Sequence, residues 1–232
     1  MRSLNNAQLS YTIAPHSAYS IDLDCQSGLS TIISVWLSRC MVASAILFAA
    51  PQLAIAQLDM RYDSKGHPKA KGVWVAVKYP GGWKSEEGER PNIVQKFSGR
   101  YQEMDTVLSL QILNAGAPVE SECKAMSIND AANAFSAPAS KVYASDFKKI
   151  MHENKPAFLY EMKGTVERAG MAITAHHKVM TVCYKNTLIS AWCSPSRFDR
   201  ASNKIFTTAA ELSKASPLCF EFFNSLVLMD NY

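Results

Sequence analysis

The feature that most constrains the fold is a stretch of alternating residues typical of a long β-hairpin. Residues 171–184 and 187–193 are rich in β-branched and aromatic residues, and the polar pair Lys185 and Asn186 separates them. With this pair as the turn, Cys183 stands opposite Leu188. Because successive side chains of a strand point to opposite faces, each face has its own set. One face carries Met171, Ile173, Ala175, His177, Val179, Cys183, Leu188 and Trp192; the other carries Thr174, His176, Lys178, Thr187 and Cys193.

This alternation also limits how the cysteines can pair. Four cysteines follow residue 56, namely Cys123, Cys183, Cys193 and Cys219. Cys183 and Cys193 point to opposite sides of the sheet, so they cannot bond to each other. Two schemes remain: Cys193 with Cys219 plus Cys123 with Cys183, or Cys123 with Cys193 plus Cys183 with Cys219. We favour the first, because Cys219 opens the expected last helix, which must pack close to the strand that leads into it.

Residues 41–56 have the pattern of a secretory signal peptide. Arg39 precedes an apolar run that contains Pro51 and ends with small residues at Ala54 and Ala56, which fits the A-x-A cleavage rule. The alternative is a retained membrane anchor, but spanning a bilayer takes roughly 20 consecutive apolar residues, and this run is shorter and is broken by proline. We therefore expect a periplasmic or secreted protein with no stable membrane span after cleavage.

The expected cleavage divides the chain into three parts. Residues 1–56 form an upstream segment and the signal peptide, residues 57–71 a mature N-terminal tail, and residues 72–232 a single domain. Either Met1 or Met41 is a candidate start of translation. The even number of mature cysteines fits an oxidising compartment. The whole chain has 24 Lys and Arg against 20 Asp and Glu, a modest excess that we interpret as a solvated surface and not as a nucleic-acid interface.

The remaining patterns complete an α+β class. Residues 217–229 carry Leu218, Phe222, Leu226 and Met229 at helical spacing, with Pro217 near the expected first turn. Ser127 is a capping-type residue that begins a short helix. Residues 194–216 are expected to be a loop with a short helix, and residues 148–152 are ambiguous. The expected strands are 73–78, 93–98, 106–113 and 157–167. We predict one antiparallel β-sheet flanked by helices.

A family resemblance rests on the order of these elements. A strand ending in Tyr79-Pro80-Gly81-Gly82-Trp83 is followed by two strands, a helix, a long antiparallel run and a closing helix that contains residues 222–226. This order resembles the PsbP-like superfamily, in particular its exported bacterial branch of the DcrB kind, over about Lys71 to Leu228. The resemblance implies an α/β/α sandwich and a binding or accessory role. It supplies no shared catalytic motif.

Motifs for catalysis, cofactors or metals are not found in the sequence. His152-Glu153 opens like a zinc-protease motif, but Pro156 stands where the second histidine would be needed. His176 and His177 are adjacent on a strand, so their side chains diverge and cannot bind one metal ion without a bulge. We therefore predict no catalytic, cofactor-binding or metal-binding residue.

Two functional hypotheses remain. The first is an exported, non-catalytic binding or accessory protein that recognises a protein or another component of the cell envelope. Tyr79, Trp83 and Arg90 are its candidate contact residues, because aromatic and arginine side chains concentrate at recognition surfaces. The alternative is a secreted hydrolase with an unrecognised site around His176. Replacement of His176 by alanine separates the two, since only the hydrolase would lose its function.

Overall fold

The structure is a computed structural model that describes residues 57–136, 141–168 and 171–232. The expected signal peptide and its cleavage site at Ala54 and Ala56 lie outside the described residues. Everything below concerns the folded unit that contains the described residues.

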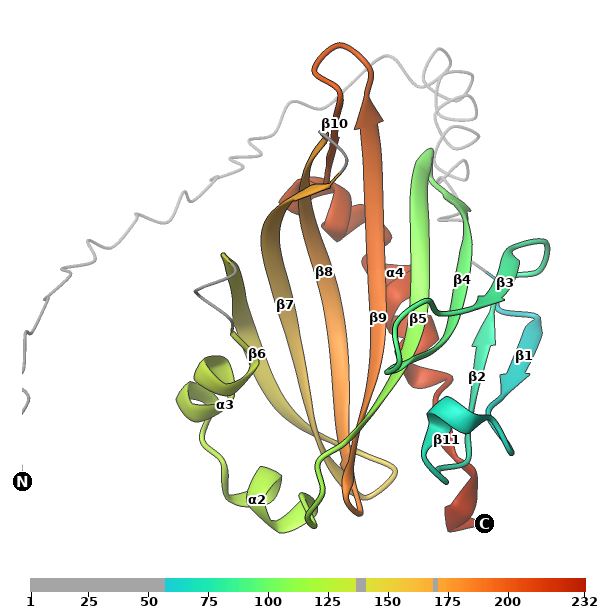
Figure 1. Ribbon diagram of the computed structural model, residues 1–232, viewed down its shortest axis with the longest axis vertical. Helices are drawn as coiled ribbons and strands as arrows, with labels where there is room; N and C mark the ends of the chain where they lie inside the picture. The colour runs from blue at the N-terminus through green and yellow to red at the C-terminus, as the bar shows by residue number, and fades with distance from the viewer. Residues whose placement is uncertain (1–56, 137–140, 169–170) are drawn as a thin grey trace, which may run out of the picture. The chain divides into compact units, whose positions relative to one another are not determined.

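An eight-stranded sheet dominates this unit, in the order β3-β4-β5-β9-β10-β8-β7-β6 (Figure 1). Neighbouring strands pair antiparallel with one exception, β10, which runs parallel to β8. Its strands are β3 (Lys84–Glu87), β4 (Ile93–Tyr101), β5 (Met104–Asn114), β6 (Val142–His152), β7 (Lys155–Arg168), β8 (Met171–Tyr184), β9 (Thr187–Asp199) and β10 (Lys204–Phe206).

The predicted hairpin is confirmed as β8 and β9. Lys185 and Asn186 form the turn, and Tyr184 pairs with Thr187 and Cys183 with Leu188. The direct pairing of β8 with β9 stops at Lys178 and Cys193. Beyond that point the short strand β10 lies between them, parallel to β8 and antiparallel to β9. The prediction of a loop with a short helix for residues 194–216 is therefore wrong, because β9 continues to Asp199 and β10 follows it.

The prediction of a single sheet is also wrong. A second, three-stranded sheet has the order β1-β2-β11, with β1 (Met60–Asp63), β2 (Val75–Tyr79) and β11 (Val227–Leu228). β1 pairs with β2 from Met60 opposite Tyr79 to Asp63 opposite Ala76. Residues 57–71, which we expected to be a tail, thus include a strand of this sheet and the 3₁₀ turn η1 (Pro68–Ala70).

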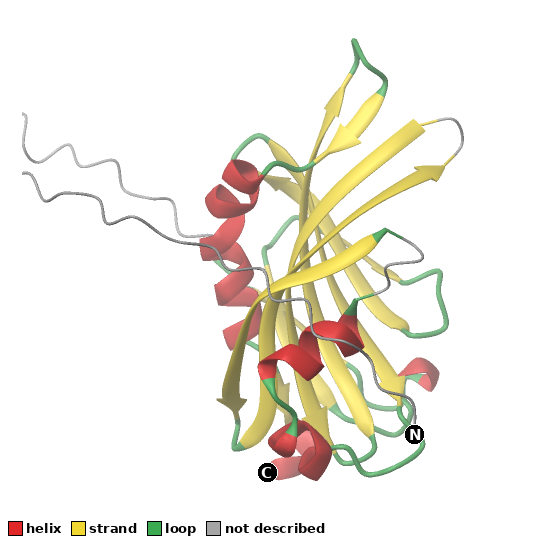
Figure 2. Cartoon of the chain, turned by 90° about the vertical axis from the view of Figure 1, so that its left-hand side faces the viewer, coloured by secondary structure: helices red, strands yellow, loops and turns green. Residues whose placement is uncertain are grey.

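Three α-helices and a second 3₁₀ turn complete the described elements: α2 (Glu120–Ala125), α3 (Ile128–Phe135), α4 (Ala209–Asn224) and η3 (Met229–Asn231). α3 begins as predicted, because the Ser127 hydroxyl accepts a hydrogen bond from the backbone N–H of Asp130. α4 packs on one face of the large sheet, and α2 and α3 pack on the other (Figure 2). We call the α4 side the back face and the α2–α3 side the front face.

The last helix differs from the prediction. It starts at Ala209, well before Pro217, because Thr208 and Glu211 form a reciprocal capping box at its N-terminus. Pro217 lies inside the helix, where it cannot donate to the carbonyl of Ser213. Ser213 and Pro217 are both exposed, so water can satisfy that carbonyl. The helix ends at Asn224, and the chain then adds β11 to the small sheet.

Both faces of the large sheet are covered by separate apolar clusters. The back cluster joins β-strand residues such as Phe97, Leu108 and Met180 to Phe222 of α4, all almost fully buried. The front cluster joins Phe158, Tyr160 and Val179 to residues of α2 and α3. Burial on two sides explains why the strands are rich in apolar residues at both odd and even positions.

Candidate functional site

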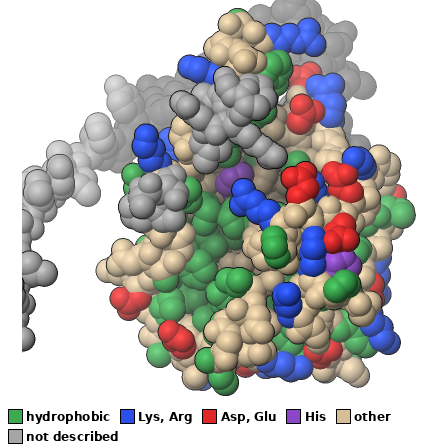
Figure 3. Space-filling view, viewed as in Figure 1, with side chains coloured by type: hydrophobic (Ala, Val, Ile, Leu, Met, Phe, Trp, Pro, Cys, Tyr) green, Lys and Arg blue, Asp and Glu red, His purple; other side chains and the backbone are tan. Residues whose placement is uncertain are grey.

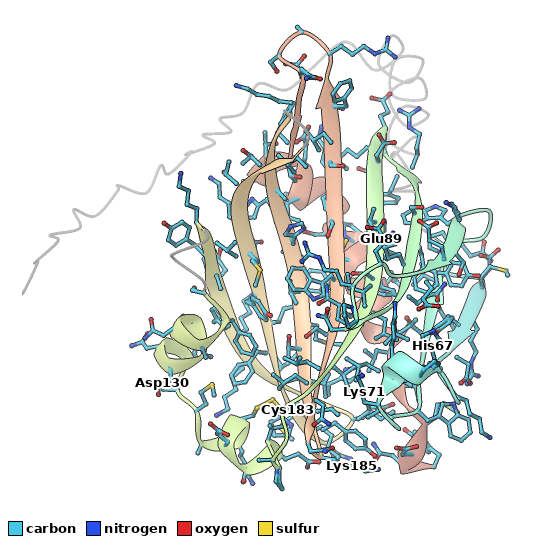
Figure 4. The ribbon with its side chains drawn as sticks, in the orientation of Figure 1. His67, Lys71, Glu89, Asp130, Cys183 and Lys185 are labelled. Carbon is cyan, nitrogen blue, oxygen red and sulfur yellow. A yellow bond between two sulfur atoms is a disulfide. The ribbon has the colours of Figure 1, made fainter. Side chains whose placement is uncertain are left out.

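Two disulfide bonds attach helices to the large sheet. Cys123 of α2 is bonded to Cys183 of β8 on the front face, and Cys193 of β9 is bonded to Cys219 of α4 on the back face. Figure 4 labels Cys183 near the β8–β9 turn, close to Lys185. This is the pairing scheme that we favoured. This scheme requires the side chains of Cys183 and Cys193 to point to opposite faces of the sheet.

The three predicted contact residues do not form one surface. Tyr79 is 8% exposed and its ring stacks on Phe97 with the centroids 4.2 Å apart, so Tyr79 is a core residue. Trp83 is half-buried and covers Gly99, where a Cβ atom would lie 2.6 Å from the indole ring. Arg90 is exposed in the loop between β3 and β4. Of the three, only Arg90 has the accessibility that a contact residue needs.

His176 belongs to a charged cluster on the back face. Its Nε2 lies 3.1 Å from Glu161 Oε2, and Lys178 Nζ lies 2.9 Å from Glu161 Oε1. All three side chains are largely buried, and the Glu161 carboxylate contacts both Lys178 and His176, so the buried lysine and carboxylate charges are paired. Within the part of the chain that the structure describes, no hydroxyl or thiol is hydrogen-bonded to His176. The arrangement therefore provides a charge network without a nucleophile next to the histidine.

The neighbouring His177 lies on the front face and has a hydroxyl partner. Its Nδ1 is 2.7 Å from Ser194 Oγ, and its ring packs edge-on against Trp192 with the centroids 5.5 Å apart. Burial, with a smaller contribution from His176, lowers the pKa of His177 to about 4. His177 is therefore neutral at pH 7. A base with so low a pKa is poorly matched to proton abstraction at neutral pH. The contact between His177 and Ser194 is better explained as a hydrogen bond that satisfies the imidazole of a core histidine.

Apolar side chains extend across the front face beside α2 and α3. Figure 3 shows them on the side of the folded unit that faces the viewer in Figure 1. The partly buried members that pack on the front cluster include Phe135, Phe147, Met162 and Trp192. The Trp192 indole N–H is buried without a hydrogen-bond partner. Much of this face is therefore occupied by packing, and it offers few polar groups to orient a ligand.

A shallow polar hollow, open to solvent and with a volume of about 860 Å³, lies at the end of the sheet near two hairpin tips. The tips belong to the β4–β5 and β9–β10 hairpins, which are adjacent because Asp105 of β5 pairs with Ser196 of β9. We call this the hairpin-tip surface. It is lined by Arg100, Gln102, Glu103, Asp105, Ser196, Arg197, Phe198 and Arg200.

Both hairpin tips are held by local backbone geometry. Gln102 and Glu103 have φ angles of 47° and 66°, which is the left-handed geometry of a tight two-residue hairpin turn. In the other tip, Asp199 accepts hydrogen bonds from the Ser202 hydroxyl and the Ala201 N–H. These bonds hold the pKa of the Asp199 carboxyl below its usual range. The surface is therefore presented by turns with defined conformations.

The arginines of this surface differ in how strongly they are engaged. Arg197 Nε lies 3.1 Å from Glu211 Oε1, which holds its guanidinium toward the N-terminus of α4. Arg100 makes an exposed contact of 3.9 Å with Asp105 and donates a hydrogen bond of 3.3 Å to the backbone carbonyl of Glu103. Among the described residues, no carboxylate lies within 4.0 Å of the Arg200 guanidinium. Phe198, which is 49% exposed, lines the same hollow, so the hollow combines an accessible aromatic residue with arginines that make few contacts with carboxylates.

Sequence reasoning did not find this surface. The hairpin tips come from segments 91 residues apart in the chain, as the hydrogen bond from Ser196 Oγ to the carbonyl of Asp105 shows. A usable signal was the run Arg197-Phe198-Asp199-Arg200, which combines an aromatic residue with two arginines.

Among the described residues, no group of three or more His, Cys, Asp or Glu side chains could hold a metal ion. None of the described helices is both long and apolar enough to cross a bilayer.

The described chain is thus an α+β protein with a large, mostly antiparallel sheet, a small second sheet and two disulfide bonds. No protein-family model and no curated protein matches the chain. Among solved structures, it is similar to the solution structure of cyanobacterial PsbP (CyanoP) from Synechocystis sp. PCC 6803, with a TM-score of 0.47 and 14% sequence identity. The alignment covers 79% of this chain and 99% of that chain. The expected resemblance to the DcrB branch stays a prediction.

Proposed function

We propose that the chain is an exported, non-catalytic binding protein that recognises a protein partner in the cell envelope through the hairpin-tip surface. Export is supported by the two disulfide bonds, since such bonds persist in oxidising compartments. It is also supported by the signal-peptide pattern in residues 41–56. A mature chain that begins at Gln57 and contains no free thiol is the expected form, and N-terminal sequencing with thiol titration of protein isolated from cells tests this directly.

The observation that carries the binding role is the exposed Phe198, which lines one hollow together with Arg100 and Arg200. Arginine and large aromatic side chains provide most of the energy at protein interfaces, because they bury a large area and also make directional hydrogen bonds. The two turns fix the positions of these side chains before a partner arrives. Less conformational entropy is then lost on binding. The available guanidinium groups favour a partner with carboxylates at the contact.

Site-specific photo-crosslinking in cells that export the chain tests the proposal. A photoreactive phenylalanine analogue is placed at Phe198 and, as a control, at Phe220, which is also exposed but lies on α4. We expect a discrete cross-linked species from position 198 and none from position 220. Combining the probe with Arg200→Glu should reduce the cross-link about tenfold, the effect of losing one hot-spot contact. Combining it with Arg90→Glu should leave the cross-link unchanged.

The same chain with the photoreactive probe also tests the hydrolase alternative. His176→Ala should leave the cross-link at position 198 intact, because His176 lies in the charged cluster of the back face and not at the hairpin tips. If the purified chain instead hydrolyses ester or amide substrates, and if His176→Ala abolishes turnover, the binding proposal is wrong. An equally strong cross-link at positions 198 and 220 would also count against it.

A further inference from the structure

The outer face of the small sheet contains a second, quite different hollow. It encloses about 180 Å³, and its lining is almost entirely apolar. Ala76 of the central strand β2 forms the floor together with Val227 of β11, and Met229 and Tyr232 come from the C-terminal segment. The hollow exists because a small residue occupies the middle of three strands.

Two cations stand at the rim of this hollow. Arg61 of β1 and Lys78 of β2 line it, and the two residues are directly opposite each other in the antiparallel register. Side chains that are directly opposite in a sheet lie on the same face with Cβ atoms about 5 Å apart, and like charges there destabilise the pairing. The sheet thus places two cationic side chains on one face, next to an apolar cavity.

Nearby carboxylates do little to neutralise this pair. Arg61 is 3.7 Å from Asp63 Oδ2, which is too long for a hydrogen bond, and the other oxygen of that carboxylate accepts bonds from the Trp74 indole and the Lys65 N–H. The other partner of the Arg61 guanidinium is the Met229 thioether, a weak acceptor, at 3.4 Å. No carboxylate of the described residues lies within 4.0 Å of Lys78 Nζ. The Arg61 and Lys78 side chains at the rim can therefore still bind an anion.

We propose that this hollow, the sheet-face pocket, binds a small carboxylic acid with a compact apolar group. The apolar group enters the cavity over Ala76 and contacts Met229, while the carboxylate lies between Arg61 and Lys78. The dry lining favours burial of the apolar group. One carboxylate relieves the repulsion between the two cations and accepts charge-assisted hydrogen bonds from both. This site is separate from the hairpin-tip surface and does not depend on the proposed function.

Phenylacetate is a suitable probe, because a single ring is compact and bears one carboxylate. Phenylacetamide, which has the same ring and no charge, is the matched control ligand. Binding to the full chain is followed through the methyl NMR signal of Met229, assigned by its loss in Met229→Leu. We expect the Met229 signal to shift and saturate with phenylacetate and to show about tenfold weaker binding of phenylacetamide. The methyl signals of buried Met104 and Met180 should not move.

Variants assign the binding to the pocket. Lys78→Gln should reduce the affinity for phenylacetate about tenfold, toward that for the amide, whereas Lys214→Gln, at an exposed position on α4, should have no effect. Ala76→Leu should abolish binding of both ligands by filling the floor. Unchanged Met104 and Met180 signals in each variant show that the core is still folded.

Several results would overturn the proposal. These are no movement of the Met229 signal at millimolar phenylacetate, equal affinity for the acid and the amide, or a Lys78→Gln variant that binds phenylacetate as well as the original chain does. Retained binding by a folded Ala76→Leu variant would place the ligand elsewhere and would likewise reject the sheet-face pocket.

Discussion

Removing the disulfide bonds should cost a large and calculable part of the stability. The Cys123–Cys183 bond closes a loop of 60 residues and the Cys193–Cys219 bond a loop of 26 residues. In the chain-entropy model these bonds destabilise the unfolded state by about 4.3 and about 3.5 kcal/mol, respectively. The two loops occupy separate stretches of the chain, so the contributions should add to about 8 kcal/mol. Folded domains are stable by about 5–15 kcal/mol in total.

The assay is equilibrium unfolding in urea of three alanine variants, one for each cysteine pair and one for all four cysteines. Each paired variant should remain folded in buffer with a free energy of unfolding lower by about 3–4 kcal/mol. The variant without any of the four cysteines should lose about 8 kcal/mol, so its unfolding midpoint should fall well below those of both paired variants. If either paired variant loses less than about 1 kcal/mol, or if the four-cysteine variant keeps a cooperative transition near that of the original chain, then the cross-links do not stabilise the fold in the way described.

Three further predictions concern stability. The lowered pKa of His177 means that its side chain binds a proton more readily in the unfolded chain than in the folded chain between about pH 4 and pH 6.5. This residue should therefore contribute a fall of about 3 kcal/mol in the free energy of unfolding, measured in urea, from pH 7 to pH 4. A folded His177→Gln variant should show a total fall that is smaller by about this amount. Thr208→Ala removes the capping box of α4 and should cost about 1 kcal/mol in the same measurement, with an unchanged transition contradicting the cap. Gly99→Ala forces a methyl group against the Trp83 ring and should lower the midpoint of thermal unfolding by several degrees, for a cost of about 1–3 kcal/mol, whereas an equal or higher midpoint would mean that the ring moves freely.

Local patterns predicted the elements that local interactions determine. The β8–β9 hairpin followed from residue alternation on either side of Lys185 and Asn186, and α3 followed from its cap at Ser127. The start of α4 was also readable, because Thr208 and Glu211 have the spacing of a capping box. It was missed because Pro217 was interpreted as the first turn of the helix.

Other features depend on contacts between distant segments. The small sheet joins β1, β2 and β11, which come from both ends of the folded unit. These strands are so short that no alternation of apolar and polar residues predicts the sheet. The hairpin-tip surface exists only because β5 pairs with β9. The error at Tyr79 was avoidable. Val75, Val77 and Tyr79 alternate onto one face of β2, and a residue on the same face as two buried valines is expected in the core.

The position of β10 between β8 and β9 protects the far ends of the long hairpin. Without β10, the far ends of β8 and β9 would have no partner on the side where the two arms separate. Each arm would then present unpaired N–H and C=O groups along an open seam, and such edges invite pairing with other chains. In the folded chain the three-residue strand β10 closes that seam, so these backbone groups are paired and are not available to another chain.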